Sequence, residues 1–469
     1  MDNPRFSEKW FMAMFDAGDE NAATAVASIA QDPELLGKLF RSIVEWETID
    51  KLLEQKKNDK TPEAEKLRAA LKIYVTKALA GVIPKDANDK EAFAKPDLIA
   101  TGQRVFWENG MIAFAILGCA SLPEAYATAY GAKVLGITAG LTEHVKRRLF
   151  ETSMFLMNVM KQDNPDPTKA MISPDGINAA LTVRLMHAVV RKLLKEPPPQ
   201  KRPDMKPESL PLETALLQKN WQKEAWGEPV NQLSMGMAIL SFSYIVLRSL
   251  RKLGIELNGH EEKAYLHCWN VVGKIMGVHD DLLLRQPETM EEAQELYERI
   301  WLRPGIIVRT EEARKLEAAL LEYMEDFVPE TFAPLRRIPR ILTAELVSSK
   351  IAGAIGLRLD WMDALGLQML RGLAHAQRFA TGVAGVAGVD LDWAGTGFQS
   401  MLKAGGLRHI RESDIDQLPP MRLAGEFLFR QMAEGLNMQQ DRGGRRGVFQ
   451  IPKTLDKHWQ IGADDDESV

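Results

Sequence analysis

Apolar residues recur at helical spacing along most of this chain. Residues 36–44 and 67–79 both carry leucine, isoleucine, valine, alanine or phenylalanine at intervals of three and four positions, the period of a helix with one apolar face. Alternating runs of β-branched residues, which are typical of strands, are scarce. The pattern predicts an all-α protein, a large multi-helix globular domain.

Several of the expected helices have recognisable starts. Thr61–Glu63, Ser121–Glu124 and Ser173–Asp175 each combine a hydroxyl residue with a proline one or two positions later. This order is typical of a helix N-cap followed by proline in the first turn. We therefore expect helices to begin at these three places.

Proline- and glycine-rich stretches divide the chain. Residues 195–211 are proline-rich, and the glycine-rich stretch 381–398 lacks the GxxxxGK motif of a phosphate-binding loop. Residues 441–447 and the acidic C-terminus have the composition of mobile segments. The sequence contains no internal repeat of fixed period. We predict an N-terminal helical layer (1–95), a functional core (96–380) and a loop-rich helical C-terminal extension with a mobile acidic tail (381–469).

Charge and cysteine content exclude several classes of protein. The chain has 59 Lys and Arg against 64 Asp and Glu, a net charge of −5, and therefore lacks the basic surface typical of nucleic-acid binders. Its two cysteines, Cys119 and Cys268, cannot form a disulfide framework, a CxxC metal site or a CxxCH haem attachment site. We expect no nucleic-acid partner.

No segment has the pattern of a membrane span or a secretion signal. The longest apolar stretch, residues 233–247, includes three serines and is shorter than the roughly 20 residues that a spanning helix needs. The N-terminus has no charged region followed by an apolar run. These features predict a cytoplasmic protein without a transmembrane helix, and they say nothing of its oligomeric state.

A histidine lies in the middle of the predicted helix over residues 177–194. One face of that helix carries Ile177, Ala180, Arg184, His187, Arg191 and Leu194. A single histidine on an apolar face is usually a hydrogen-bonded structural residue. A haem, however, needs a neutral imidazole on its iron and cations near its propionates, and this face offers both. The spacing makes His187 a candidate iron ligand and Arg184 and Arg191 candidate propionate contacts.

A second predicted helix, over residues 143–160, carries a polar stripe. Arg148, Glu151, Thr152 and Phe155 fall at i, i+3, i+4 and i+7. One interpretation is a surface ion pair between Arg148 and Glu151, which contributes little to stability. The other is a polar patch in a cavity, in which Arg148 and Thr152 orient dioxygen and Glu151 accepts a proton.

Together, several segments carry a family resemblance. They are Trp107–Leu117, Ser121–Tyr126, the RxxxT of Arg148 and Thr152, Val183–Arg191, Val230–Gln232, Leu240–Ser243 and Trp269–Val278. In this order they resemble the MpaB/rubber-oxygenase catalytic domain of latex-clearing-protein type. The resemblance covers roughly residues 100–285, and the histidine segment is its most specific part.

The resemblance implies an all-helical fold around a non-covalent b-type haem, with His187 as the proximal iron ligand and Arg148 and Thr152 beside the haem. It also implies an oxygenase that uses dioxygen to cleave a carbon–carbon double bond in a hydrophobic, isoprenoid or lipid-like substrate. One position departs from the pattern: rubber-cleaving members carry lysine immediately before the threonine, where this chain has Glu151. A carboxylate cannot replace the amine of that lysine, so Glu151 counts against cleavage of rubber itself.

Two other classes of helical protein are alternatives. Class I terpene synthases bind magnesium through carboxylates at helical spacing, but Asp280 and Asp281 are followed by three leucines, and Ala238 stands where the second motif after Asn231 would need a glutamate. A non-enzymatic helical binding or scaffold protein would need no cofactor. Trp269, near the end of the resemblance, is expected to be a core residue.

Overall fold

The computed structural model describes residues 4–29, 60–84, 91–129, 152–153, 155–162, 166–195, 221–326 and 336–372, together with residues 89, 131 and 164. The predicted helix over residues 36–44, the proline-rich connector after residue 195 and the whole extension 381–469 lie outside these ranges. In its first half the chain forms η1 (Pro4–Phe6), α1 (Glu8–Phe15), α2 (Glu20–Ile29), α5 (Pro62–Leu79), α6 (Pro96–Glu108), α7 (Gly110–Ile116), the π-helix η2 (Leu117–Ser121), α8 (Leu122–Tyr126), η3 (Pro167–Lys169) and α11 (Pro174–Lys195).

The second half continues in the same way. Its elements are α13 (Lys223–Trp226), α14 (Gln232–Phe242), α15 (Tyr244–Lys252), α16 (Gly259–Ile275), η5 (Asp280–Leu282), α17 (Met290–Trp301), α18 (Glu311–Asp326), α19 (Ile338–Leu346) and α20 (Ser349–Ile355). Among the described residues there is no strand, and the only β-type pairing is an isolated bridge between Thr128 and Ile307. The predicted all-α fold is confirmed.

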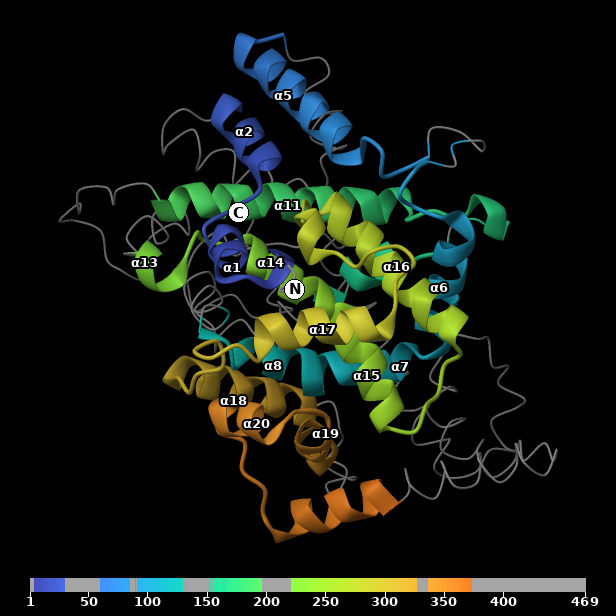
Figure 1. The fold of residues 1–469 in the computed structure, drawn as a ribbon, viewed down its shortest axis with the longest axis vertical. Coiled ribbons are helices and arrows are strands. Elements are labelled where there is room, and N and C mark those ends of the chain that lie inside the picture. Colours follow the sequence, from blue (N-terminus) through green and yellow to red (C-terminus); the bar gives the residue numbers. More distant parts are fainter. Residues whose placement is uncertain are drawn as a thin grey trace, which may run out of the picture.

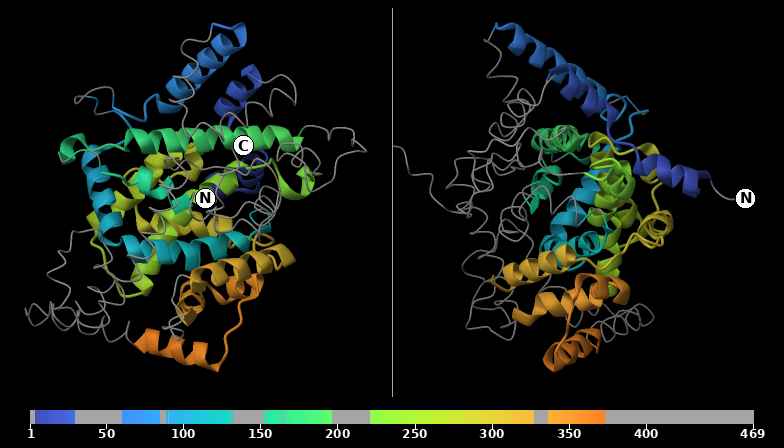
Figure 2. Two further views of the ribbon diagram at one scale, coloured as in Figure 1. Left: turned by 180° about the vertical axis from the view of Figure 1, so that it is seen from behind. Right: turned by 90° about the vertical axis from the view of Figure 1, so that its left-hand side faces the viewer.

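The helices are arranged around α16. Helix α6 packs along α16, while α11 and α14 contact it from other sides. Figure 1 shows α11 lying across the molecule, with α2 and α5 together on one side of it, and Figure 2 shows the same arrangement from two further directions. Helices α18, α19 and α20 lie at the opposite end (Figure 1). Trp269 in α16 and Trp301 in α17 are fully buried, which confirms Trp269 as a core residue.

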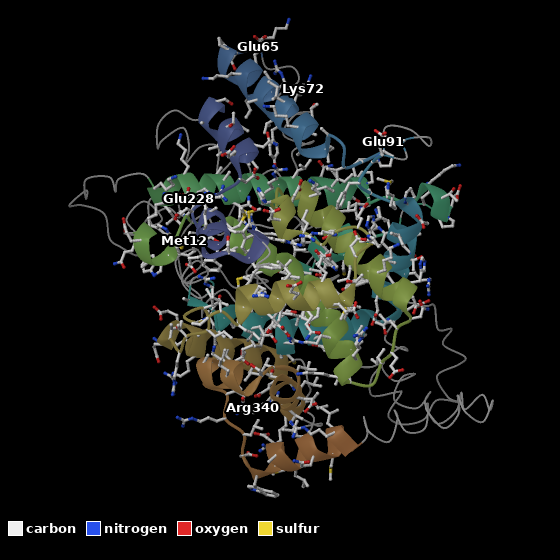
Figure 3. All side chains as sticks on the ribbon, viewed as in Figure 1. Met12, Glu65, Lys72, Glu91, Glu228 and Arg340 are labelled. Atoms are coloured by element: carbon white, nitrogen blue, oxygen red, sulfur yellow. The ribbon has the colours of Figure 1, made fainter. Side chains whose placement is uncertain are left out.

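The N-terminal helices share the core of the rest of the protein. Trp10 and Phe11 of α1 and Val26 of α2 belong to the same cluster of buried apolar residues as α16. The outer face of α5 is charged, and Glu65 and Lys72 project from it into solvent (Figure 3). The division of the chain at residues 95 and 380 stays a prediction.

Helices begin at all three predicted places, and two of them have the predicted N-cap. The Thr61 hydroxyl accepts the N–H of Ala64, and the Ser173 hydroxyl accepts the N–H of Gly176 at 2.9 Å, as N-caps do. At the third, α8 does begin at Leu122 with proline in its first turn, but Ser121 does not cap it, because Ser121 has helical backbone angles and its hydroxyl donates to the main-chain oxygen of Ser241 at 2.6 Å. The π-helix therefore runs on into α8 without a cap.

In the part of the chain that the structure describes, one helical stretch is long and apolar enough to cross a membrane. It is Gln232–Lys252, and 78% of its most apolar window is buried inside the protein. The pair Pro96–Glu108 and Ile112–Tyr126 qualifies only when taken as one bent span. Core helices have the same apolar character, so this finding does not test the prediction that the protein lacks a transmembrane helix.

A buried carboxyl group in α18 links stability to pH. Glu317 is 2% exposed, and neither of its carboxyl oxygens has a hydrogen-bond partner in the described part of the chain. Burial raises the pKa of this side chain to about 8, an effect that the charge of Arg340 only partly offsets. Glu317 is therefore protonated in the folded protein at neutral pH, whereas in the unfolded chain it ionises near its ordinary pKa of 4.5.

We expect Glu317→Gln to change the pH dependence of folding. Because the folded state holds the proton more tightly, the contribution of Glu317 is fully present below pH 4.5 and is lost as pH rises from 4.5 through 8. The variant should raise the free energy of unfolding at pH 8 relative to pH 5 by about 1–3 kcal/mol compared with the wild type. Denaturant titrations at the two pH values measure this difference, and parallel curves for both proteins would contradict it.

Candidate functional site

His187 is the accessible side chain on an otherwise buried segment of α11. Every other residue from Ala179 to Arg191 is buried, whereas His187 is partly exposed. The Nδ1 atom of His187 is itself shielded from solvent, so the accessible surface of this residue lies elsewhere than Nδ1. The imidazole is therefore shielded from solvent at Nδ1 and accessible at another part of the residue.

Arg184 lies one turn before His187 and is committed to an ion pair. Its Nε and one terminal nitrogen donate to the carboxylate of Asp19 at 2.5 and 2.9 Å, and its other terminal nitrogen donates to the main-chain oxygen of Ile275. Burial lowers the pKa of Arg184, but the hydrogen bond and the charge of Asp19 more than offset this, so the pKa lies above its usual value. A propionate contact would require Arg184 to release Asp19, and that role stays a prediction.

Arg191, one turn after His187, also binds main-chain atoms. It donates to the carbonyl oxygens of Pro229 and Val230 at 2.9 and 2.6 Å, while its Nη1 is buried without a hydrogen-bond partner in the described residues. Burial lowers its pKa. The contacts with Pro229 and Val230 join the C-terminal part of α11 to the residues just before α14. Of the two arginines, Arg191 alone keeps a free buried donor.

The helix that carries Thr152 crosses α11 near its start. Residues 152–153 and 155–159 are helical, and Thr152 is partly exposed. A Cβ atom on Gly176 would lie 2.6 Å from the main-chain oxygen of Asn158, so the two backbones touch at that point. Since eleven residues make just over three turns, Gly176 and His187 share one face of α11, about 16 Å apart.

Helix α14 forms the third side of this region. Phe242 at its C-terminal end lies 6.4 Å, ring centre to ring centre, from Phe155 and stacks on Trp269 at 4.8 Å. Although α14 is otherwise buried, Ser234, Ala238 and Phe242, spaced four residues apart, are partly or fully exposed.

Three helices therefore contact one another in pairs near their ends: α11, the helix over residues 155–159 and α14. We call this arrangement the three-helix frame. Its corners are the contacts of Gly176 with Asn158, of Arg191 with Val230, and of Phe155 with Phe242. Each side of the frame carries accessible side chains: His187, Thr152, and the row from Ser234 to Phe242.

The other candidate residues fall into two groups. Arg148 and Glu151 lie outside the described residues. The two carboxylates of the terpene-synthase alternative have structural contacts, because Asp280 pairs with Lys274 and Asp281 accepts the indole N–H of Trp10. In the described part of the chain no three histidine, cysteine, aspartate or glutamate side chains converge as a metal site.

Sequence reasoning missed two features of this region. Asp19, the partner of Arg184, is 165 positions away along the chain, and no local pattern links the two. The accessible row on α14 could have been found from its four-residue spacing, but Ser234 and Ala238 are small and lack an obvious chemical role.

Comparison with known proteins indicates the family of this chain. A family profile described as "ER-bound oxygenase mpaB/B'/Rubber oxygenase, catalytic domain" matches residues 104–379, more than half of the chain. A rubber oxygenase from a Streptomyces species is 26% identical over 147 residues. That match spans 31% of this chain and only 30% of the relative's length.

The fold has a counterpart among solved structures. The structure of latex clearing protein in the closed state is similar with a TM-score of 0.55 at 19% sequence identity, and the superposition covers 88% of this chain and 90% of that one. At this identity the likeness establishes the fold alone. Together with the match over residues 104–379, it leads to one conclusion: this chain belongs to the mpaB and rubber oxygenase catalytic-domain family.

Proposed function

We propose that this protein is a haem b-dependent oxygenase that cleaves a carbon–carbon double bond of a hydrophobic, isoprenoid or lipid-like substrate. The observation that carries the proposal is the partly exposed imidazole of His187 on an otherwise buried helix. Family membership supports the oxygenase class. The cytoplasmic location predicted from the sequence remains part of the proposal.

The residues of the three-helix frame fit a haem. A porphyrin needs one imidazole donor and broad apolar surfaces. His187 supplies the first, with Nδ1 held in the protein interior, while Ala238, Phe242 and Phe155 supply apolar surface. The buried Nη1 of Arg191 is a donor suited to a propionate. Arg184 would first have to release Asp19 to take the same role.

When bound, the haem supplies a redox-active iron that reacts with dioxygen, chemistry that side chains alone do not provide. The protein's own residues have simpler tasks. His187 holds the cofactor from one side, and the Thr152 hydroxyl donates a hydrogen bond that orients dioxygen. Phe155 and Phe242 exclude water. The double bond breaks, and each of its carbons takes one oxygen atom of dioxygen, so no further reductant is needed.

The activity is tested with a matched pair of hydrocarbons. We expect haem-loaded protein to consume dioxygen and form carbonyl products with squalene, which has double bonds, and to do neither with squalane, its saturated counterpart. Emulsified rubber latex provides a third arm, in which Glu151 in place of lysine predicts little turnover. Absence of oxygen uptake with both squalene and latex would contradict the proposal.

Thr152→Val tests the role of the hydroxyl. The substitution keeps the size and branching of the side chain but removes the donor, so haem content should be unchanged. Loss of one hydrogen bond to a developing charge typically costs about 10²–10³ in rate, and we expect a decrease of this order in oxygen uptake. Turnover equal to the wild type would exclude Thr152 from the chemistry.

A further inference from the structure

Four residues from separate segments of the chain meet beside the corner of the three-helix frame where α11 meets α14. They are Asp19 between α1 and α2, Arg184 in α11, Gln232 at the start of α14 and Gly277 just after α16. The side chains of Asp19, Arg184 and Gln232 are all buried. We call these four residues the hub. The hub joins a segment near the N-terminus to three helices of the core.

The side chain of Gln232 connects three of these segments. Its amide nitrogen donates to the main-chain oxygens of Gly18 and Gly277 at 2.9 and 3.0 Å, and its amide oxygen accepts the N–H of His279 at 2.8 Å. The main-chain N–H of Gln232 donates to the oxygen of Ala17 at 2.9 Å. Because the amide has two hydrogens, both are in use. Gln232 therefore fixes the start of α14 against the N-terminal segment and the end of α16.

The ion pair of Asp19 with Arg184 has the same effect on α11. Arg184 lies one turn before His187, and it also donates to the main-chain oxygen of Ile275, the last residue of α16. Gly277 makes room for the pair, because it has a φ of 78° and a Cβ atom on it would lie 2.5 Å from the Asp19 carboxylate and 2.6 Å from the Arg184 Nε. Helices α11 and α14 are therefore held by the same two parts of the chain, the segment between α1 and α2 and the end of α16.

The segment between α1 and α2 lies outside the region that matches the family profile. That match begins at residue 104, whereas the first residue of the hub is Asp19. The neighbouring Gly18 also packs against Arg191, since a Cβ atom on Gly18 would lie 2.6 Å from the Arg191 Nε. Arg191 in turn binds the carbonyl oxygen of Val230 at the corner between α11 and α14. Residues before the matched region thus contact that corner directly.

We propose that the hub positions His187 by fixing α11 relative to α14. Gln232 and Asp19 are then positioning residues, because they are buried and act through the two helices. Groups behind a metal ligand commonly set its orientation in this way. The part of the inference that concerns haem rests on the proposed function, whereas the placement of the two helices does not.

The distance between two nitroxide labels tests this placement in the full-length, haem-free protein. Asp175→Cys on α11 and Ala238→Cys on α14 replace exposed residues, and the two native cysteines are buried. Double electron–electron resonance should give a narrow distance distribution when the hub is intact. Gln232→Met keeps the length of the side chain but removes its hydrogen bonds, and it should broaden or shift the distribution.

Asn270→Leu is the matched control for Gln232→Met. Asn270 in α16 is also a buried amide, which donates to the Leu284 carbonyl and the Glu288 carboxylate and accepts the N–H of Leu284. Its substitution should lower the urea midpoint but leave the label distance unchanged.

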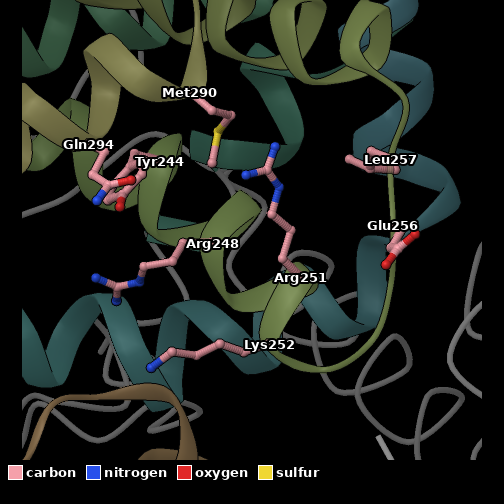
Figure 4. A pocket seen from close by; sticks show the side chains of 8 residues that line it. All are labelled: Tyr244, Arg248, Arg251, Lys252, Glu256, Leu257, Met290 and Gln294. Carbon is pink, nitrogen blue, oxygen red and sulfur yellow. The ribbon is translucent and has the colours of Figure 1, made fainter. Parts of the chain in front are cut away.

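A second control breaks a link between two other helices. Arg251 in α15 donates to Glu262 in α16 at 2.7 and 2.6 Å, beside the pocket shown in Figure 4. Since this ion pair is not part of the hub, Arg251→Met should leave the label distance unchanged as well.

The rate of haem dissociation is the second readout. Transfer of haem to excess apomyoglobin should be about 10-fold faster from Gln232→Met than from the wild type, the lower end of what loss of a ligand's supporting groups costs. Asn270→Leu should release haem at the wild-type rate, although it loses as many hydrogen bonds. A difference between these two variants separates positioning of His187 from a general loss of stability.

Gly18→Ala is a milder variant that keeps the test valid if Gln232→Met does not fold. It adds one methyl group against Arg191 without removing a hydrogen-bonding group, and it should change the label distance and the haem dissociation rate in the same direction. Gly353→Ala in α20 is its control, because a Cβ atom there would have no neighbour within 4 Å.

The outcomes separate this inference from the proposed function. A label distance that stays the same in both Gln232→Met and Gly18→Ala would overturn the inference, whether or not the protein binds haem. Equal haem dissociation from Gln232→Met and Asn270→Leu would overturn the positioning of His187. If the wild type bound no haem but the label distance still shifted in the two hub variants, the proposed function would fail and the role of the hub in placing α11 and α14 would be supported.

Discussion

His187→Ala should reduce the affinity of the protein for haem at least about 100-fold, since loss of a ligand's outer-shell partner alone costs roughly 10–100-fold. His187 is partly exposed between buried neighbours on α11, so its truncation removes a donor without opening a fully buried cavity. Titration with hemin, followed by the Soret absorbance, measures the change. Circular dichroism should show unchanged helix content.

His260→Ala and His267→Ala are the controls for this experiment. His260 is exposed on α16, and its loss should leave haem binding unaltered. His267 is fully buried, with Nδ1 bonded to Glu288 at 2.8 Å and Nε2 accepting the N–H of Lys95. Its substitution should lower stability rather than haem affinity. Equal haem affinity in the His187 variant and the wild type would remove His187 as the ligand.

Asp19→Asn should destabilise the protein by about 3–5 kcal/mol, the usual cost of leaving one partner of a buried ion pair without the other. Asp19 and Arg184 are both buried, and they join the segment between α1 and α2 to α11. Asparagine keeps the size of the side chain and can still accept the N–H of Asn21 near the start of α2, so the main loss is the charge opposite Arg184.

The matched control is Asp175→Asn, in the first turn of α11. Asp175 pairs with Lys161, but its side chain is 63% exposed, and such surface pairs contribute less than about 1 kcal/mol. Urea denaturation of both variants measures the two costs. A loss from Asp19→Asn no larger than that from Asp175→Asn would show that the buried pair does not hold the N-terminal segment in place.

Local pattern predicted the all-α fold because the helical period and the caps at Thr61 and Ser173 are properties of neighbouring residues. The family was likewise recognisable from short segments in a fixed order, and the match over residues 104–379 confirms it. Ser121 was misread because its acceptor, the carbonyl of Ser241, lies 120 positions away. Such a tertiary hydrogen bond overrides the local capping signal.

The candidate site was predictable only in part, for the same reason. The spacing of Arg184, His187 and Arg191 placed them on one helix, but spacing cannot tell which charged side chain already has a partner. The buried carboxylate of Asp19 and the carbonyls of Pro229 and Val230 decide that question. Whether Arg148 and Glu151 join Thr152 at the three-helix frame stays a prediction.

The central claim is that this protein holds a haem through His187, and the most direct test is a hemin titration of the purified full-length wild type. We predict saturable binding of one haem per chain, with a Soret band that persists through gel filtration and is lost in the His187→Ala variant. Protein that stays colourless after incubation with hemin and gel filtration would contradict the claim.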